Sequence, residues 1–286
     1  MKQEPLAPST RRLATLLEIA TGQTLSESRL WRLETALQPL LRDHEMASLG
    51  DLVDRISQEP EGVVGRAVVN ALLNNETSFF RDAHVFKMLG RQLFPDMLKQ
   101  IEARDGKRPL RVWCAGCSTG QEAYSLAMTF CNAVEGIGPA QVKILATDVS
   151  TAAIERAKGG MFGQIDVQRG LPINDLLRWF EPKGDEWQIH RALRDIIDFR
   201  VDNLFDDMAV RGEFDIVLCR NVLIYFSAER KRALHHLLAR HCRAGGYLLL
   251  GAGETVIGQT GDFSASQRYR GVYQRIDPRY GDGSAA

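Results

Sequence analysis

Two features of the chain have the residue types needed to bind a nucleoside. In CAGCSTG, residues 114–120, Gly116 and Gly120 are spaced Gly-x-x-x-Gly, which differs from the three-glycine dinucleotide motif. The turn also lacks a phosphate-binding lysine, so it does not predict a nucleoside triphosphate site. Asp148 closes the apolar run KILATD, and a carboxylate at the end of a second strand can accept both hydroxyls of a ribose. Together the turn and the acid favour nucleoside binding.

Each of these residues also has a structural alternative. A turn of small residues can simply let a helix pack closely on a sheet. Asp148 could cap the next helix, although Ser150 could take that role instead. Glu122 falls in the first turn of a predicted helix, where a negative charge is favourable without any ligand.

Polar residues also follow two later apolar runs. Asn203, beside the apolar Leu204, suits the edge and face of an adenine ring. Arg220 and Asn221 end the run FDIVLCRN, and Tyr225 follows shortly after. Each of these could be a satisfied loop residue. Four consecutive strand ends with suitable chemistry are better explained by one ligand at the carboxyl edge of a sheet.

The segment NNETSFFRD, residues 74–82, precedes the first of these runs. It contributes Asn75, Thr77 and Arg81 as further candidate ligand contacts. The two phenylalanines are expected in the core. The alternative for Thr77 is a helix cap, and for Arg81 it is a solvated charge.

The elements that must position these residues alternate between strand and helix from residue 110 onward. Apolar strands alternating with helices predict a parallel sheet covered on both faces. Residues 161–198 interrupt the alternation and are predicted to form a small β-rich insertion. Residues 269–276 are predicted to form a final edge strand. Strands are predicted at 110–115, 141–148, 196–202, 214–221 and 245–251, and helices at 121–134, 150–159 and 227–243.

Residues 9–72 show only helical periodicity and predict a small helical domain. Over the whole chain, 36 Lys and Arg balance 36 Asp and Glu, which argues against a general nucleic-acid or membrane-surface protein. No secretory signal or membrane-spanning run is recognisable. We therefore expect a soluble, cytoplasmic protein that inserts into no membrane and binds no nucleic acid.

The five cysteines include a single C-x-x-C, Cys114 and Cys117, at the end of the first strand. An odd number of cysteines in a chain of this length argues against a disulfide framework. No second C-x-x-C accompanies the pair, and the histidines at 235, 236 and 241 lack the spacing of a zinc helix. We expect no metal site.

The combination of motifs resembles one known family. NNETSFFRD, CAGCSTGQEAYSLAM, ATDVS, VDNL, CRNVLIYF and GGYLLLGAGE occur in the order and spacing of the chemotaxis receptor methyltransferases (CheR). The resemblance covers about residues 10–276. It implies an α/β fold in which a small all-helical domain, residues 1–72, precedes a Rossmann-like class I methyltransferase domain, residues 73–280. An antiparallel β-subdomain is inserted at about 161–198, and residues 281–286 are expected to be a disordered tail.

The resemblance implies transfer of a methyl group from S-adenosyl-L-methionine to receptor glutamates, which leaves S-adenosyl-L-homocysteine. Since this cofactor carries no phosphate, neither a lysine nor a third glycine is required in the turn. Arg81 and Tyr225 correspond to residues that flank the transferred methyl. The implied cofactor contacts are Asn75, Thr77, Arg81, Gly116, Glu122, Asp148, Asn203, Leu204, Arg220 and Asn221.

The implied partner is the cytoplasmic helical region of a chemoreceptor, a methyl-accepting chemotaxis protein, and the enzyme itself is expected to be a monomer. The hairpin FEPKGDEWQIH, residues 180–190, looks shorter than in members that bind a receptor's C-terminal pentapeptide tether, so we predict independence of such a tether. Residues 1–73 carry eight Lys and Arg against ten Asp and Glu, which gives little basic character for receptor recognition. Two alternatives remain open: a methyltransferase of this fold acting on another substrate, and a non-catalytic cofactor-binding sensory module.

Overall fold

The computed structural model describes residues 7–277 apart from 26, 31–32, 61, 107, 135–140 and 207–211. The predicted disordered tail, 281–286, lies outside the described residues. The chain divides into two compact units, which are considered separately. One comprises Met1–Asn74 with Tyr225–Arg230, and the other comprises Asn75–Ile224 with Lys231–Ala286.

The first unit is helical, as the periodicity predicts. Leucine, isoleucine and valine side chains spaced three or four residues apart pack together in its core, Leu17, Leu37 and Leu52 among them. Ser48 and Asp51 form a reciprocal capping box at the start of the fourth helix. The helices are α1 (Pro8–Thr21), α2 (Glu27–Leu30), α3 (Leu33–Asp43), α4 (Leu49–Gln58) and α5 (Val63–Leu72).

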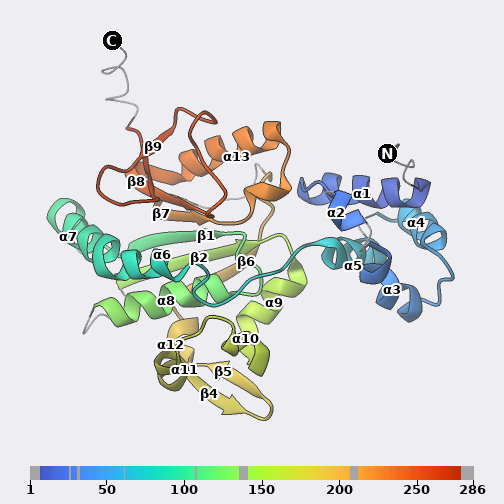
Figure 1. Cartoon of the computed structure of the whole chain (residues 1–286), viewed down its shortest axis with the longest axis horizontal. Helices are drawn as coiled ribbons and strands as arrows, with labels where there is room; N and C mark the ends of the chain where they lie inside the picture. The colour runs from blue at the N-terminus through green and yellow to red at the C-terminus, as the bar shows by residue number, and fades with distance from the viewer. Residues whose placement is uncertain are drawn as a thin grey trace. The chain divides into compact units, whose positions relative to one another are not determined.

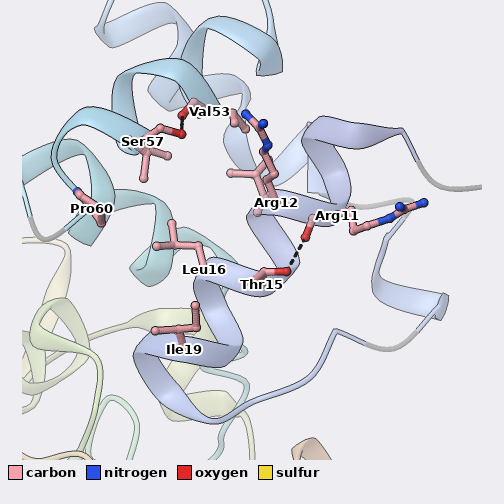
Figure 2. Close-up of a pocket in the computed structure, with 10 residues that line it drawn as sticks. Arg11, Arg12, Thr15, Leu16, Ile19, Val53, Ser57 and Pro60 are labelled. Atoms are coloured by element: carbon pink, nitrogen blue, oxygen red, sulfur yellow. Dashed lines mark hydrogen bonds between the residues drawn. The ribbon is translucent and has the colours of Figure 1, made fainter.

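A hollow of about 460 Å³ opens between α1 and the end of α4. Figure 2 shows Leu16 and Ile19 of α1 across this hollow from Ser57 and Pro60. Ile19 is 76% exposed.

Among the described residues, no helix of either unit has the length and apolar character required to cross a bilayer.

The second unit is built on a seven-stranded sheet in the order β6-β2-β1-β7-β8-β10-β9. The five strands from β6 to β8 are parallel, and β10 runs antiparallel to both β8 and β9. β1 and β7 lie in the middle and are buried almost throughout, which explains their near-continuous apolar sequences. The strands are β1 (Leu110–Ala115), β2 (Val142–Asp148), β6 (Ile197–Val201), β7 (Phe214–Cys219), β8 (Cys242–Leu250), β9 (Phe263–Ala265) and β10 (Tyr273–Arg275).

Helices connect and cover these strands. The predicted helices after β1, β2 and β7 are confirmed as α8 (Gln121–Ala133), α9 (Thr151–Gly159) and α13 (Ala228–His241). Before β1 the chain forms α6 (Ala83–Met88), a π-helical stretch η1 (Leu89–Leu93) and α7 (Phe94–Asp105). Short helices α10 (Gln164–Gln168), α11 (Ile173–Trp179) and α12 (Arg191–Arg194) belong to the insertion.

The insertion forms a separate three-stranded antiparallel sheet in the order β3-β5-β4, which confirms the predicted β-subdomain. Its strands are β3 (Met161–Gly163), β4 (Phe180–Lys183) and β5 (Glu186–Ile189). Figure 1 shows the insertion, in yellow, set apart from the main sheet beyond α8 and α9. Phe162 and Phe180 of the insertion pack edge-on against Phe79, with ring centroids 4.9 and 5.7 Å away. Phe79 is therefore a core residue, as predicted.

One strand prediction was wrong in position. Residues 269–276 do supply β10, but β9 pairs with its outer side and takes the edge of the sheet. β9 spans only three residues, Phe263–Ala265, and two of these are exposed. So short a segment carries no readable alternation of apolar and polar residues, and its strand conformation depends on β10.

Candidate active site

The glycine turn follows β1 and lies against the end of β2. The N–H groups of Gly116 and Cys117 both donate to the carbonyl of Thr147, at 2.8 and 2.9 Å. Gly116 has a φ of 79°, and a Cβ on it would lie 2.5 Å from Cγ2 of Val222. Only glycine fits a position that combines this backbone conformation with so close an approach.

Asp148 fastens the glycine turn to the end of β2. Its Oδ2 accepts the N–H of Ser118 at 2.8 Å, and its Oδ1 accepts the N–H of Ser150 at 2.9 Å. Ser150 caps α9 through the N–H of Ala153, so the capping role considered for Asp148 belongs to Ser150. Burial raises the pKa of Asp148, although the backbone N–H groups of Ser150, Ser118 and Val149 oppose the rise.

Asn75 and Thr77 lie beside the glycine turn. The carbonyl of Asn75 accepts the hydroxyl of Ser118 at 2.8 Å. Both residues line a hollow of about 340 Å³ together with Thr119 and Gln121. The tertiary structure thus brings the segment before the sheet next to the first strand end.

Arg220 connects three parts of the site. Its Nη1 donates to Oε2 of Glu122 at 2.7 Å, and its Nη2 donates to Oδ2 of Asp82 at 2.6 Å and to the carbonyl of Arg81 at 3.0 Å. The side chain of Arg220 is fully buried. Its buried Nε–H has no partner among the described residues and is available for the predicted cofactor contact.

The turn that carries Arg81 is strained. Phe80 and Asp82 have φ values of 47° and 60°, and each such non-glycine residue costs about 1–3 kcal/mol. The N–H of Phe80 donates to the hydroxyl of Ser125 in α8 at 2.9 Å. Arg81 is a half-buried residue, and its guanidinium has no hydrogen-bond or ion-pair partner among the described residues.

The ends of β7 and β8 are joined through Glu254. Its Oε2 accepts the N–H of Asn221 at 2.8 Å and the N–H of Gly251 at 2.7 Å, while its Oε1 is buried without a partner among the described residues. Asn221 has a φ of 59°. Beyond β6, the side chain of Asn203 accepts the N–H of Phe205 at 3.1 Å, and Leu204 is buried.

Tyr225 makes its contacts within the helical unit. It ends the 3₁₀ turn η3 (Leu223–Tyr225) after β7. Its hydroxyl accepts Nδ2 of Asn74 at 2.5 Å, its carbonyl accepts the N–H of Thr24 at 2.9 Å, and the guanidinium of Arg29 lies 5.4 Å from its ring centroid. These contacts orient the phenol. Its predicted catalytic role stays a prediction.

Sequence reasoning missed four residues that hold the site together: Asp82, Ser118, Ser125 and Glu254. Asp82 lies in the motif NNETSFFRD directly after Arg81, and Glu254 lies in GGYLLLGAGE directly after Gly253. Their positions in these motifs could have identified both acids as site residues. The two serines gave no signal, because a buried hydroxyl is identified only by the backbone group it meets.

The C-x-x-C cysteines pack inside the unit. Cys114 and Cys117 are buried thiols, and burial raises the pKa of both. The Cys114 Sγ lies 3.4 Å from Oε1 of Glu122 as a weak donor. In the part of the chain that the structure describes, no group of three or more His, Cys, Asp or Glu is arranged to hold a metal ion.

The polar groups of the site fit a cationic nucleoside cofactor without a phosphate group. Asp148 offers two carboxylate oxygens at a strand end, and Glu122 places a further carboxylate at the first turn of α8. Nε of Arg220 and Oε1 of Glu254, at the ends of β7 and β8, are buried and have no partner in the described part of the chain.

Residues 75–272 match the family model described as CheR methyltransferase, SAM binding domain. The chemotaxis protein methyltransferase Cher2 of Pseudomonas putida is 38% identical over 261 residues, which cover 90% of this chain and 93% of the relative. Chemotaxis protein methyltransferase 1 of Pseudomonas aeruginosa is 40% identical over 244 residues, 84% of this chain and 87% of the relative. Among solved structures, a magnesium protoporphyrin IX methyltransferase from Synechocystis with bound SAH matches 74% of this chain and 70% of its own, with a TM-score of 0.29 and 18% identity, too weak a likeness to support an argument.

Proposed function

Because this chain belongs to the CheR methyltransferase family, we propose that it methylates glutamate side chains in the cytoplasmic helices of chemoreceptors. S-adenosylmethionine is the cofactor of the matched domain, as predicted, and S-adenosylhomocysteine is the product. When bound, the cofactor supplies an electrophilic methyl group. The product on the receptor is a glutamyl methyl ester that serves sensory adaptation.

The availability of Arg81 is the observation that carries this proposal. Arg220 binds the carboxylates of both Asp82 and Glu122, so these three charges are paired with one another through Arg220. Arg81, the chain neighbour of Asp82, has no hydrogen-bond or ion-pair partner for its guanidinium in the described residues. A guanidinium that no described residue pairs suits a substrate that carries a carboxylate.

The reaction needs orientation more than proton transfer. A glutamate with an ordinary pKa of about 4.3 is already ionised at neutral pH, so no general base is required. Arg81 would guide the incoming carboxylate without clamping it, because a tight ion pair would lower its nucleophilicity. Holding the reactants in attack geometry can contribute roughly 7–11 kcal/mol.

The remaining site residues would hold the cofactor. We assign the ribose to Asp148 and the adenine to Asn203 and Leu204. The backbone of Gly116 would lie close to the methionine half, with Nε of Arg220 as a further donor. Asn75, Thr77, Arg81, Glu122 and Asn221 are the other predicted cofactor contacts.

The test is transfer of labelled methyl from S-adenosylmethionine to a purified chemoreceptor cytoplasmic fragment, followed by mild base to release methanol. Base-labile label on the receptor is the expected result. Arg81→Ala should lower kcat by about 10²-fold. Arg91→Ala, an exposed arginine of η1, is the matched control and should not. Confirmed cofactor binding without label on any of several receptors would contradict the proposal in favour of another substrate or a sensing role.

Tyr225→Phe tests the second catalytic assignment. Removal of the hydroxyl keeps the ring, which lies against Arg29. We expect a smaller loss of kcat than for Arg81→Ala. Unchanged kcat would remove Tyr225 from the catalytic residues.

We further propose that binding needs no pentapeptide tether. β4 and β5 pair Lys183 with Glu186, which leaves only Gly184 and Asp185 as the hairpin turn. So short a turn supports the prediction made from the sequence. Calorimetry with the pentapeptide should give no binding, and receptors with and without the tail should be methylated at equal rates. Selective tight binding would refute this.

Recognition of the receptor would take place in the cytoplasm, where the methylated helices of chemoreceptors lie. We also propose that the enzyme acts as a monomer. Light scattering on a size-exclusion column should give the mass of one 32.0 kDa chain. A dimer at micromolar concentration would contradict this part of the proposal.

A further inference from the structure

The turn that carries Arg81 has a backbone that the surrounding structure must impose. Phe80 and Asp82, the residues on either side of Arg81, both have positive φ, and neither is glycine. A bulky residue such as phenylalanine rarely adopts this conformation, and it persists only where neighbouring groups over-determine it. Groups outside the turn must therefore hold it.

Arg220 provides that hold from the end of β7. Its Nη2 donates both to the carboxylate of Asp82 and to the carbonyl of Arg81, at 2.6 and 3.0 Å. Its Nη1 is fixed to Glu122 of α8 at 2.7 Å. The Arg220 side chain is fully buried, while the Asp82 side chain is 32% exposed, so water screens the bond to Asp82 in part. Through these bonds the strained turn is tied to both a strand and a helix of the main sheet layer.

The ordinary explanation for Asp82 would be helix capping, since it occupies the N-cap position of α6. Its side chain makes no capping hydrogen bond, however. The carboxylate is directed to Arg220 instead. Capping therefore does not account for an aspartate at this position.

Arg81 has no comparable hold on its own side chain. Its guanidinium has no partner within the described part of the chain, so its direction depends on the backbone that carries it. A displacement of about 1 Å in a residue that orients a reactant can lower the rate by about 10²-fold. The turn geometry is thus important for any reaction that uses Arg81.

We propose that Asp82 is a positioning residue for Arg81: the bridge Glu122–Arg220–Asp82 holds the Phe80–Asp82 turn in the conformation that aims the Arg81 guanidinium at the substrate carboxylate. The inference rests on the proposed function of Arg81 in methyl transfer. Asp82 itself touches neither substrate nor cofactor in this scheme.

Two substitutions separate the acceptor from the backbone conformation. Asp82→Gly adopts positive φ without strain but removes the acceptor for Arg220, whereas Asp82→Asn keeps an acceptor and tolerates positive φ. We expect Asp82→Gly to lose about 10²-fold in kcat with little change in S-adenosylhomocysteine affinity, and Asp82→Asn to retain most of the turnover. Asp96→Asn is the control, because Asp96 forms an equally short 2.6 Å ion pair with Arg268 away from the turn.

Amide hydrogen exchange of residues 79–83, measured without substrate, is the second readout. Exchange should accelerate in Asp82→Gly and stay close to wild type in Asp96→Asn. Full turnover by Asp82→Gly, or unchanged exchange in its turn, would overturn the proposal. A parallel loss of cofactor affinity and kcat would also overturn it, in favour of a role in binding. If the wild type methylates no receptor, the proposed function fails, while the exchange measurement still decides whether Asp82 holds the turn.

Discussion

Two turns of the same unit, residues 114–120 and residues 79–82, reach the candidate site by different means. The first places Gly116 and Gly120 at two of its positive-φ positions, and a Cβ on Gly116 would clash with Val222. The second adopts positive φ at Phe80 and Asp82, where no glycine is present. The first turn has glycine at two of its three positive-φ positions, the third being Ser118 with a φ of 51°, whereas the second turn has no glycine and is imposed by its neighbours.

The neighbours show the same contrast. The glycine turn is held largely by backbone groups, including the carbonyl of Thr147, with help from Asp148. The second turn depends on side chains from distant segments, Ser125 and Arg220. The conformation of the second turn is therefore set by other parts of the fold, as is usual for strained backbone at functional sites.

Gly116→Ala should have the largest effect on this comparison. The alanine would have a strained φ, and its Cβ would lie 2.5 Å from Cγ2 of Val222. We expect the free energy of unfolding to fall by at least about 2 kcal/mol and cofactor binding to be lost. Gly258→Ala is the control, because its φ is 72° but no atom of the described residues lies within 4 Å of the added Cβ. It should cost about 1 kcal/mol from strain alone.

Chemical unfolding and calorimetry with S-adenosylhomocysteine measure both quantities. Adding Val222→Ala to Gly116→Ala should recover part of the lost affinity, since it removes the nearest contact atoms. If Gly116→Ala costs no more than Gly258→Ala, close approach does not explain the glycine.

Ser125→Ala should have the next largest effect, on the other turn. It leaves the N–H of Phe80 without its acceptor, at a cost of about 1–3 kcal/mol, and should lower turnover. Thr129→Val is the control, because the Thr129 hydroxyl donates only to a carbonyl of its own helix, that of Ser125. Thermal unfolding of both variants decides the matter: equal losses would mean that the serine matters to α8 and not to the turn.

The pH dependence of cofactor binding should be the smallest effect, and it concerns the acid of the glycine turn. An unfolded aspartate has a pKa of about 3.9, and burial raises that of Asp148 in the folded protein. Ionising Asp148 therefore costs stability, so its favourable contribution is complete below the unfolded pKa and is lost as pH rises through the folded pKa. Because the ribose hydroxyls need the ionised form, cofactor affinity should instead increase with pH through that same folded pKa.

Carbon-detected NMR of the aspartate carboxyls measures the pKa of Asp148 in the folded protein. Calorimetry across the same pH range measures the affinity for the cofactor product. Asp262 is the internal reference: partial burial would raise its pKa, but hydrogen bonds from Thr260 and His236 hold it below the usual value. Addition of S-adenosylhomocysteine should lower the pKa of Asp148 and leave Asp262 unchanged. If Asp148 titrates below Asp262, the assigned effect of burial is wrong.

Much of the fold was predictable because it depends on local patterns. β1 and β7 are apolar over their whole length, and α8 and α9 begin beside Gly120 and Ser150, so their types and approximate ends follow from the sequence. β9 was not predictable, because its three residues become a strand only by pairing with β10.

The candidate site divides in the same way. Gly116 and Asp148 were found from the sequence because a glycine turn after one apolar run and an acid at the end of the next favour a nucleoside site when taken together. The partners of Arg220 could not be read, since Glu122 and Asp82 lie 98 and 138 residues away along the chain. The cofactor assignments of the individual residues stay predictions.

The sequence alone determined the helical first unit, the parallel sheet with its insertion, and the family with its cofactor, because periodicity, turn residues and motif order are properties of short segments. Only the tertiary structure decided that Arg220 binds two carboxylates, that Phe80 and Asp82 are forced into positive φ, and that Arg81 is left unpaired among the described residues. The reason is physical: ion pairs and backbone strain depend on which distant groups fold into contact, and no local pattern in the chain encodes that proximity.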